Sequence, residues 1–200
     1  MVRDPRIQRT MEAIRAAAMA LLRDEGVGAL STVRVCREAQ VARSTFYEHY
    51  RAPWEPAFEA LQRSFFERFP EYREEASLLD PQSLLASGKP LSFPMFAHIE
   101  EHVDLYRRIF ETEAGASLVR ALERAVQTVS RKQHAALRQL SSVEIDAERT
   151  AAYLAGALVA TARHWVSSEP RESATQLSYW FSRMAAPGLL QIMGLEALLE

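Results

Sequence analysis

The feature that most constrains the fold is a segment of twenty residues in which two short helical patterns are separated by a tight turn. Residues 31–50 read STVRVCREAQVARSTFYEHY. Ser31 and Thr32 offer hydroxyls that can accept hydrogen bonds from the free amides of a helix start. Apolar residues then follow at helical spacing, namely Val33, Cys36 and Ala39. This spacing predicts a first helix of about two turns.

A second helical pattern follows over 43–50, after the turn at Gln40. The inward positions of the turn and of this helix are Val41, Phe46 and Tyr50. The opposite side is rich in hydrogen-bond donors and consists of Arg43, Ser44, Thr45, Tyr47 and His49. Arginine can bind guanine with two hydrogen bonds, and hydroxyls suit base edges and phosphate oxygens. The segment therefore predicts a helix-turn-helix whose second helix enters the major groove. A buried helical hairpin with an ordinary polar surface is the alternative that spacing alone leaves open.

A third helix is predicted upstream of this segment. Asp4 is a capping residue followed by a proline suited to the first turn of a helix, and Gly26 can end that helix. Between them, apolar residues recur at steps of three and four, at Met11, Ile14, Ala18 and Leu21. Three helices therefore occupy the first fifty residues.

The region AIRAAAMALLRDEGVGALSTVRVCREAQVARSTFYEHY resembles the N-terminal signature of the tetracycline-repressor (TetR) family of bacterial transcription regulators. Its most specific part is 41–50, which lies where the family has its Val-Ser-x-x-Thr-Leu-Tyr-x-His-Phe segment. The resemblance implies an all-α fold with a helix-turn-helix DNA-binding domain over 1–52 and a helical effector-binding and dimerisation domain over 53–200. It covers about a quarter of the chain, since the family's C-terminal part diverges widely.

The resemblance also implies roles for individual side chains. Thr32 resembles the capping residue whose hydroxyl also touches phosphate. Base contacts are implied for Arg43, Ser44 and Thr45, phosphate contacts for Tyr47 and His49, and core positions for Phe46 and Tyr50. The implied partner is a double-stranded DNA operator.

Three positions depart from the family pattern. Gln40 stands where a turn glycine is usual, so either the turn tolerates another residue or its geometry differs. Ala42 replaces the usual capping serine, which weakens the helix start by about 1 kcal/mol. Pro53 replaces a lysine that commonly docks on phosphate, and we expect lower affinity and a lower salt slope without it.

Charge is distributed in mild agreement with DNA binding. The first 51 residues hold nine arginines and six acidic residues, which gives them a net charge of +3. The whole chain has a net charge of −2, so the remaining residues carry a net charge of −5. With 200 residues and 48% hydrophobic content, the chain can bury a substantial core. Two joined helical parts are therefore expected.

Targeting and redox signals are weak. Arg3, Asp4 and Arg6 interrupt any apolar run at the N-terminus, so a cytoplasmic protein is expected. The most apolar run, over 151–162, is too short to span a bilayer, so no membrane partner is expected. The single cysteine, Cys36, lies on an apolar helix side and is expected to act as a small apolar residue.

The chain beyond residue 52 predicts further helices. An aromatic stripe predicts a fourth helix, with Trp54, Phe58, Leu61, Phe65 and Phe69. Residues 70–92 are irregular, with one short helix suggested at Asp80-Pro81. Later helices are expected over 93–111, 115–140, 141–162 and from Pro170 to Pro187, followed by a short terminal helix. The helix over 141–162 is expected to begin with a capping box formed by Ser141 and Glu144.

The last two long helices predict a homodimer. The apolar run over 151–162 needs cover on several sides, and the helix after it carries Leu177, Trp180, Phe181 and Met184 along one side. In the TetR family this helix pair forms the dimer interface, and the resemblance implies the same here. One reading helix contacts few bases, so two subunits are needed to address half-sites about 34 Å apart. Burial of these side chains within one subunit is the alternative.

One motif invites a different function. The residues from His98 to His102 match the H-x-x-E-H pattern of some zinc peptidases. A catalytic zinc needs a third ligand and an open position, and no partner motif follows. An all-helical metal-binding protein or enzyme that uses His98 and His102 therefore stays an alternative, as does a helical interaction module that has lost DNA binding. We expect that the protein is not an enzyme and binds no cofactor, since the sequence contains neither a nucleophilic triad nor a phosphate-binding loop.

The resemblance further implies a cavity for a small-molecule effector among the fourth to seventh helices. Aromatic and aliphatic side chains there could enclose an apolar or aromatic molecule. The expected lining is Phe65, Phe96, Ile99, His102, Tyr106, Leu122, Tyr153, Ala157, Thr161 and Trp165. Ordinary core packing is the alternative for each of them. The resulting hypothesis is a repressor that releases its operator when an effector shifts the fourth helix.

Overall fold

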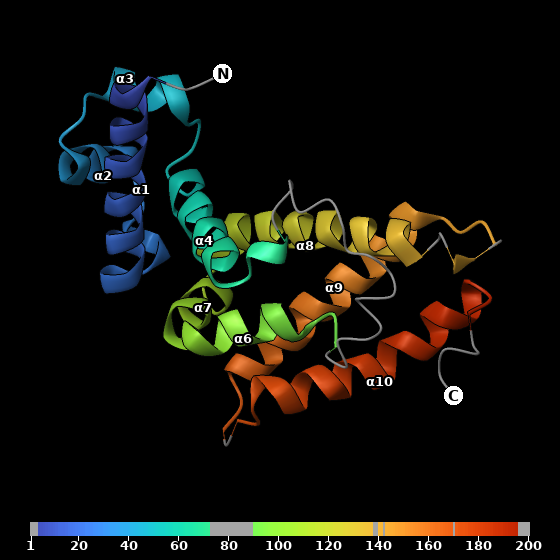
Figure 1. Cartoon of the computed structure of the whole chain (residues 1–200). Helices are drawn as coiled ribbons and strands as arrows, with labels where there is room; N and C mark the ends of the chain where they lie inside the picture. The colour runs from blue at the N-terminus through green and yellow to red at the C-terminus, as the bar shows by residue number, and fades with distance from the viewer. Residues whose placement is uncertain (1–3, 73–89, 138–139, 142, 170, 196–200) are drawn as a thin grey trace. The chain divides into compact units, whose positions relative to one another are not determined.

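The computed structural model describes residues 4–72, 90–137, 140–141, 143–169 and 171–195. Within these ranges every regular element is a helix, and no strand occurs (Figure 1). The all-α fold class is thereby confirmed. No helix in the described ranges has the length and apolarity needed to cross a membrane.

The chain forms two compact units. The first runs to Glu67 and also includes Asp104–Ala121, and the second comprises Arg68–Val103 and the chain from Leu122 onward. A segment from the middle of the sequence therefore belongs to the same unit as the three N-terminal helices. The expected division into a DNA-binding domain over 1–52 and an effector-binding and dimerisation domain over 53–200 is a division by function, and it stays a prediction.

Local sequence signals set the limits of helix α1 (Pro5–Glu25) in the first unit. The Asp4 carboxylate accepts a hydrogen bond from the Arg6 amide at 2.8 Å, and Pro5 occupies the first turn. Gly26 ends the helix at a φ of 88°, which favours glycine. The predicted first helix is confirmed at both ends.

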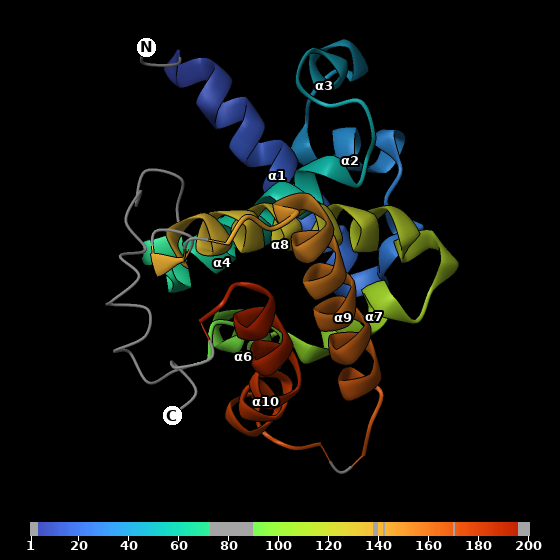
Figure 2. The ribbon, with the colours of Figure 1, turned by 90° about the vertical axis from the view of Figure 1, so that its right-hand side faces the viewer.

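Four further helical elements follow: η1 (Val27–Ala29), α2 (Thr32–Ala39), α3 (Arg43–His49) and α4 (Glu55–Arg68). Helix α1 packs against α2, and α2 packs against α3, as Figures 1 and 2 show. The centre of this group consists of the fully buried side chains of Ile14, Leu22, Val35 and Phe46. The helical spacing through Val33 does not mark the buried side of α2, because the Val33 side chain is 50% exposed and that of Val35 is fully buried.

The remainder of the first unit comes from α7 (Val103–Phe110), η3 (Glu113–Gly115) and the beginning of α8 (Ala116–Leu137). A Cβ atom on Gly115 would lie 1.8 Å from the backbone oxygen of Ile109. Only glycine allows the chain to pass this close to the end of α7. The single helix expected over 93–111 is wrong in its continuity, because His102, at φ −125° and ψ 34°, separates α6 (Phe93–Glu101) from α7.

The second unit contains η2 (Pro70–Tyr72), α6, most of α8, α9 (Ala147–Val166) and α10 (Ala174–Ile192). Helix α6 packs against α10 (Figure 2). The Phe96 ring lies edge-on to Trp165 at 6.0 Å and to Phe181 at 5.9 Å between ring centroids. Edge-to-face pairs at this distance are favourable beyond the area they bury. This aromatic group forms the centre of the second unit.

Two helix starts differ from the sequence prediction. Helix α9 begins after Asp146, whose carboxylate accepts from the Arg149 amide at 3.0 Å, so the capping box predicted at Ser141 is wrong. The Ser141 hydroxyl instead donates to the Met193 carbonyl. Helix α10 has a capping box of Ser173 and Gln176 and continues past Pro187 to Ile192. The short helix suggested at Asp80-Pro81 lies outside the described residues, as do residues 196–200 of the predicted terminal helix.

Candidate nucleic-acid interface

Ser31 caps the first helix of the predicted DNA-reading pair. Its hydroxyl oxygen accepts a hydrogen bond from the Arg34 amide at 3.3 Å, and Thr32 is the first residue inside α2. The prediction that Thr32 is the cap is therefore wrong. The Thr32 side chain is half-buried at the helix start. Its contact with phosphate stays a prediction.

The turn between α2 and α3 uses a left-handed residue that is not glycine. Gln40 has a φ of 55° and a ψ of 41°. The Val41 amide donates to the Cys36 carbonyl at 3.0 Å, which closes the end of α2. Among the described residues other than glycine, Gln40 alone has a positive φ. The turn thus tolerates a glutamine where the family usually has glycine.

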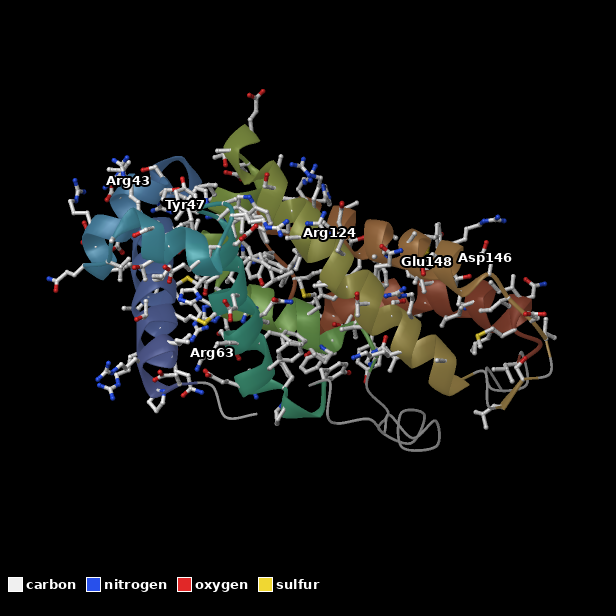
Figure 3. The ribbon with its side chains drawn as sticks, turned by 90° about the horizontal axis from the view of Figure 1, so that it is seen from above. Arg43, Tyr47, Arg63, Arg124, Asp146 and Glu148 are labelled. Carbon is white, nitrogen blue, oxygen red and sulfur yellow. The ribbon has the colours of Figure 1, made fainter. Side chains whose placement is uncertain are left out.

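Helix α3 has two distinct sides. Phe46 is fully buried and Tyr50 is 6% exposed, and their ring centroids lie 5.6 Å apart. On the other side Arg43, Ser44 and Tyr47 are exposed, while Thr45 and His49 are half-buried. The predicted inward positions of Phe46 and Tyr50 are confirmed. Figure 3 shows Arg43 and Tyr47 on the visible outer side of the helix.

The start of α3 has no side-chain cap. Ala42 occupies the N-cap position and makes no side-chain hydrogen bond to the first turn. The Phe46 ring lies edge-on to Tyr47 at 5.5 Å, so the exposed Tyr47 ring rests on the buried one. The contacts described for this helix therefore lie on its buried aromatic side rather than at its first turn.

Behind α3, the Tyr50 hydroxyl donates to the Glu59 carboxylate of α4 at 2.6 Å, and Arg15 of α1 donates to the same carboxylate at 2.8 Å. Sequence reasoning missed Glu59 and Arg15. No local pattern distinguishes them from other charged residues on helix surfaces, and only the packing of three helices brings them together.

Cys36 lies beneath this surface and is 5% exposed. Burial raises the pKa of the Cys36 thiol, and the nearby Arg43 charge opposes this rise. The thiol therefore stays protonated at neutral pH and packs as a small apolar group.

The residues of the expected effector cavity fall in both units. Phe65 and Tyr106 belong to the first unit and the other eight to the second. Phe96, Ile99, Tyr106 and Trp165 are buried, whereas Phe65, His102, Leu122, Ala157 and Thr161 are half-buried. Tyr153 is 70% exposed. A lining role for these residues stays a prediction.

The four residues of the expected dimer surface divide into two pairs. Leu177 and Phe181 are buried within the second unit, at 4% and 8% exposure. Trp180 and Met184 are exposed, at 51% and 68%. In this chain alone, only the second pair presents apolar surface outward.

The histidine motif lies at the end of α6. The His98 and His102 rings are 4.8 Å apart, and His98 is 1% exposed. The part of the chain that the structure describes holds no group of three His, Cys, Asp or Glu residues that could bind a metal ion. A zinc ion needs at least three protein ligands, so this motif does not supply a metal centre from the described residues.

The comparisons with known proteins agree with this arrangement. Residues 14–52 match the family model described as bacterial regulatory proteins, tetR family. A search of curated proteins finds no match.

Solved structures with the same fold cover nearly the whole chain. The FadR repressor of Thermus thermophilus, solved with lauroyl-CoA, is 24% identical, with a TM-score of 0.58 over 90% of this chain and 95% of that one. A TetR regulator of Streptococcus agalactiae is 20% identical, with a TM-score of 0.54 over 92% and 98%. DhaS, described as an activator of a dihydroxyacetone kinase operon, is 15% identical, with a TM-score of 0.58 over 92% and 97%. The helix-turn-helix region over 14–52 thus matches the model of the bacterial tetR regulatory family, and the chain shares its all-helical fold with solved transcriptional regulators.

Proposed function

We propose that the protein is a homodimeric repressor that binds a two-fold symmetric DNA operator and releases it when a small molecule binds the second unit. The observation that carries this proposal is the two-sided character of α3. Phe46 and Tyr50 fix one side in the core, and the opposite side exposes Arg43, Ser44 and Tyr47. Such a helix has the donors needed to read base edges and contact phosphates.

In this proposal Arg43, Ser44 and Thr45 contact bases, because they occupy the N-terminal end of α3, which enters the groove first. Thr32, Tyr47 and His49 contact phosphates. The proline at position 53 leaves one phosphate contact fewer than the family pattern provides, and the missing cap at Ala42 weakens the start of α3. We therefore expect modest affinity and a shallow dependence on salt.

Dimerisation is supported by exposed apolar side chains on α10. Trp180 and Met184 are more than half exposed, as is Ile192 at 52%. Large apolar side chains gathered on one helix commonly mark a protein interface. A second copy of the chain is the proposed partner, since symmetric dimers are the commonest assemblies and an operator read by two helices requires one.

Effector binding is supported by polar atoms buried in the second unit. The Ser92 hydroxyl and the Gln133 side-chain nitrogen have no hydrogen-bond partner among the described residues, although both residues are 7% exposed. Unpaired buried polar groups are costly, and a ligand or water bound beside either atom would satisfy it. The Thermus relative was solved with lauroyl-CoA, so an acyl or other largely apolar effector is the class to test first.

Release requires that the effector change the position of α4. This helix follows α3 directly in sequence, and its residues up to Glu67 belong to the unit that holds α3. A coupling of about 1 to 3 kcal/mol between effector and operator is typical of such systems. DhaS, a solved structure with a similar fold, is described as an activator, so the experiment must also distinguish repression from activation.

The proposal is tested by selection from a randomised pool of DNA duplexes with the purified full chain. We expect recovery of a two-fold symmetric consensus with half-sites about one helical turn apart. A monomeric protein that enriches no sequence would contradict the proposal and favour a helical interaction module. Acyl compounds added to the isolated complex would then show whether the effector class is correct and whether binding falls or rises.

A further inference from the structure

The Glu59 carboxylate connects three helices of the first unit. Its Oε1 atom accepts a hydrogen bond from Arg15 Nη1 of α1 at 2.8 Å. Its Oε2 atom accepts a hydrogen bond from the hydroxyl of Tyr50, the C-cap residue of α3, at 2.6 Å. A single side chain of α4 is therefore bonded both to α1 and to the end of the helix that faces DNA.

A second pair of contacts supports the same connection. Arg15 Nη2 donates to Glu12 at 2.8 Å, and Arg63 of α4 donates to Glu12 as well. Figure 3 shows Arg63 between α1 and α4. The Arg15 side chain is only 11% exposed and that of Glu59 35%. Charge-assisted hydrogen bonds in such partly buried places are stronger and more directional than exposed ion pairs.

The Tyr50 hydroxyl keeps its proton in this environment. Burial, together with the hydrogen bond to Glu59, raises the pKa of Tyr50 above its ordinary value. The phenol therefore remains a donor at any pH at which the protein is used. Phenylalanine, which the family motif has at this position, offers no such bond, so the link depends on the tyrosine that this chain has there.

We propose that Glu59 is a positioning residue that sets the orientation of α3 on DNA through the Tyr50 hydroxyl. This inference rests on the proposed function, because it concerns how α3 meets base edges. Arg43 lies seven residues before Tyr50, about 10 Å along the helix. A tilt of about 10° at the Tyr50 end would move Arg43 by almost 2 Å, which is enough to break base contacts with narrow distance limits.

The expected consequence is a loss of sequence discrimination. Non-specific binding depends on the number of positive charges near phosphates and tolerates small tilts. Tyr50→Phe removes only the hydroxyl and keeps both the charge and the ring that packs on Phe46. We expect this variant to bind the operator about tenfold more weakly, while its affinity for unrelated DNA stays within about twofold.

The experiment measures the affinity of the full chain for the selected operator and for a scrambled duplex of equal length, at one salt concentration, by fluorescence anisotropy. Tyr50→Phe and Glu59→Gln are the test variants. Glu67→Gln is the matched control, because it makes the same substitution and charge change on the same helix, at a residue whose ion pair with Arg63 is exposed. Thermal melting of each variant shows that binding is measured on folded protein.

The inference predicts a reduced ratio of operator to scrambled affinity for both test variants and a parental ratio for Glu67→Gln. The double variant should lose about as much discrimination as the more affected single variant, and less than the sum of the two losses, because both changes act on the same link. The inference would be overturned if Tyr50→Phe kept the parental ratio of operator to scrambled affinity, or if it lost affinity equally for both duplexes. If Glu59→Gln does not fold, Tyr50→Phe alone decides the test. If the parental protein itself fails to distinguish the duplexes, the proposed function is wrong, and this inference with it.

Discussion

The two units fix their key helices by different means. In the first unit the seven-residue helix α3 is held by one buried phenylalanine and by Tyr50, whose hydroxyl is bonded to a charged network on α1 and α4. In the second unit α9 and α10 have 20 and 19 residues, and aromatic rings from α6, α9 and α10 meet at Phe96. Long helices bury wide apolar faces there.

The difference reflects helix length and function. A helix of two turns that must expose one side has too little apolar surface to define its own orientation. Hydrogen bonds to charged groups define angles as well as distances, so they supply the missing constraint. A long helix in a core gains stability from area and does not need such directional contacts. The precision with which α3 meets DNA should therefore depend on directional contacts in the first unit. The stability of the second unit should depend on its buried apolar side chains.

The largest effect is expected from Gly115→Ala in the first unit. The added Cβ would lie 1.8 Å from the Ile109 backbone oxygen, so the chain between α7 and α8 must shift. We expect a loss of about 3 kcal/mol or more in the free energy of unfolding, measured in urea. Gly28→Ala is the control, because nothing lies within 4 Å of its Cβ position. Similar losses in both variants would mean that the tight junction is not the cause.

A smaller effect is expected from acid in the second unit. Burial, with a contribution from the His102 charge, lowers the pKa of His98 to about 4. The unfolded chain therefore binds a proton at higher pH than the folded one, and stability is lost as the pH falls from about 6.5 towards 4. His98 should account for about 2 kcal/mol of lost unfolding free energy between pH 7.5 and pH 5.

This acid effect is measured by comparing urea unfolding of the parental protein and His98→Gln at the two pH values. The variant should lose about 2 kcal/mol less than the parent on acidification. Equal pH dependence in both proteins would show that His98 is not desolvated as its burial implies.

Arg43→Ala separates binding from stability in the first unit. Arg43 is exposed at the start of α3, so its removal should leave urea unfolding unchanged. Operator binding should weaken by about 1 to 3 kcal/mol in anisotropy titrations. Arg149→Ala is the control of equal charge, since that side chain is 86% exposed on α9. If both variants weaken operator binding equally, Arg43 reads no base and contributes only charge.

Features of the fold that depend on local spacing could be predicted from the sequence, whereas those that depend on the packing of distant helices could not. The sides of α3 follow from short spacing, so the inward positions of Phe46 and Tyr50 were predictable. The break at His102 and the start of α9 at Asp146 were not, because several residues nearby were equally good helix or cap residues. The Glu59 link was missed for a stronger reason. Its partners lie 44 and 9 residues away, and only the tertiary packing of charged helix surfaces joins them.

The smallest expected effect concerns the turn between α2 and α3. Gln40 has a φ of 55°, which costs a residue with a Cβ roughly 1 to 2 kcal/mol, whereas glycine adopts it freely. Gln40→Gly relieves this strain, although glycine also gains freedom in the unfolded chain. We therefore expect the free energy of unfolding to rise by about 0.5 to 1 kcal/mol in urea, with operator affinity unchanged. Gln40→Ala keeps the strain and should give no gain. A loss of operator affinity in Gln40→Gly would show instead that a stiff turn, together with Glu59, holds α3 in its reading orientation.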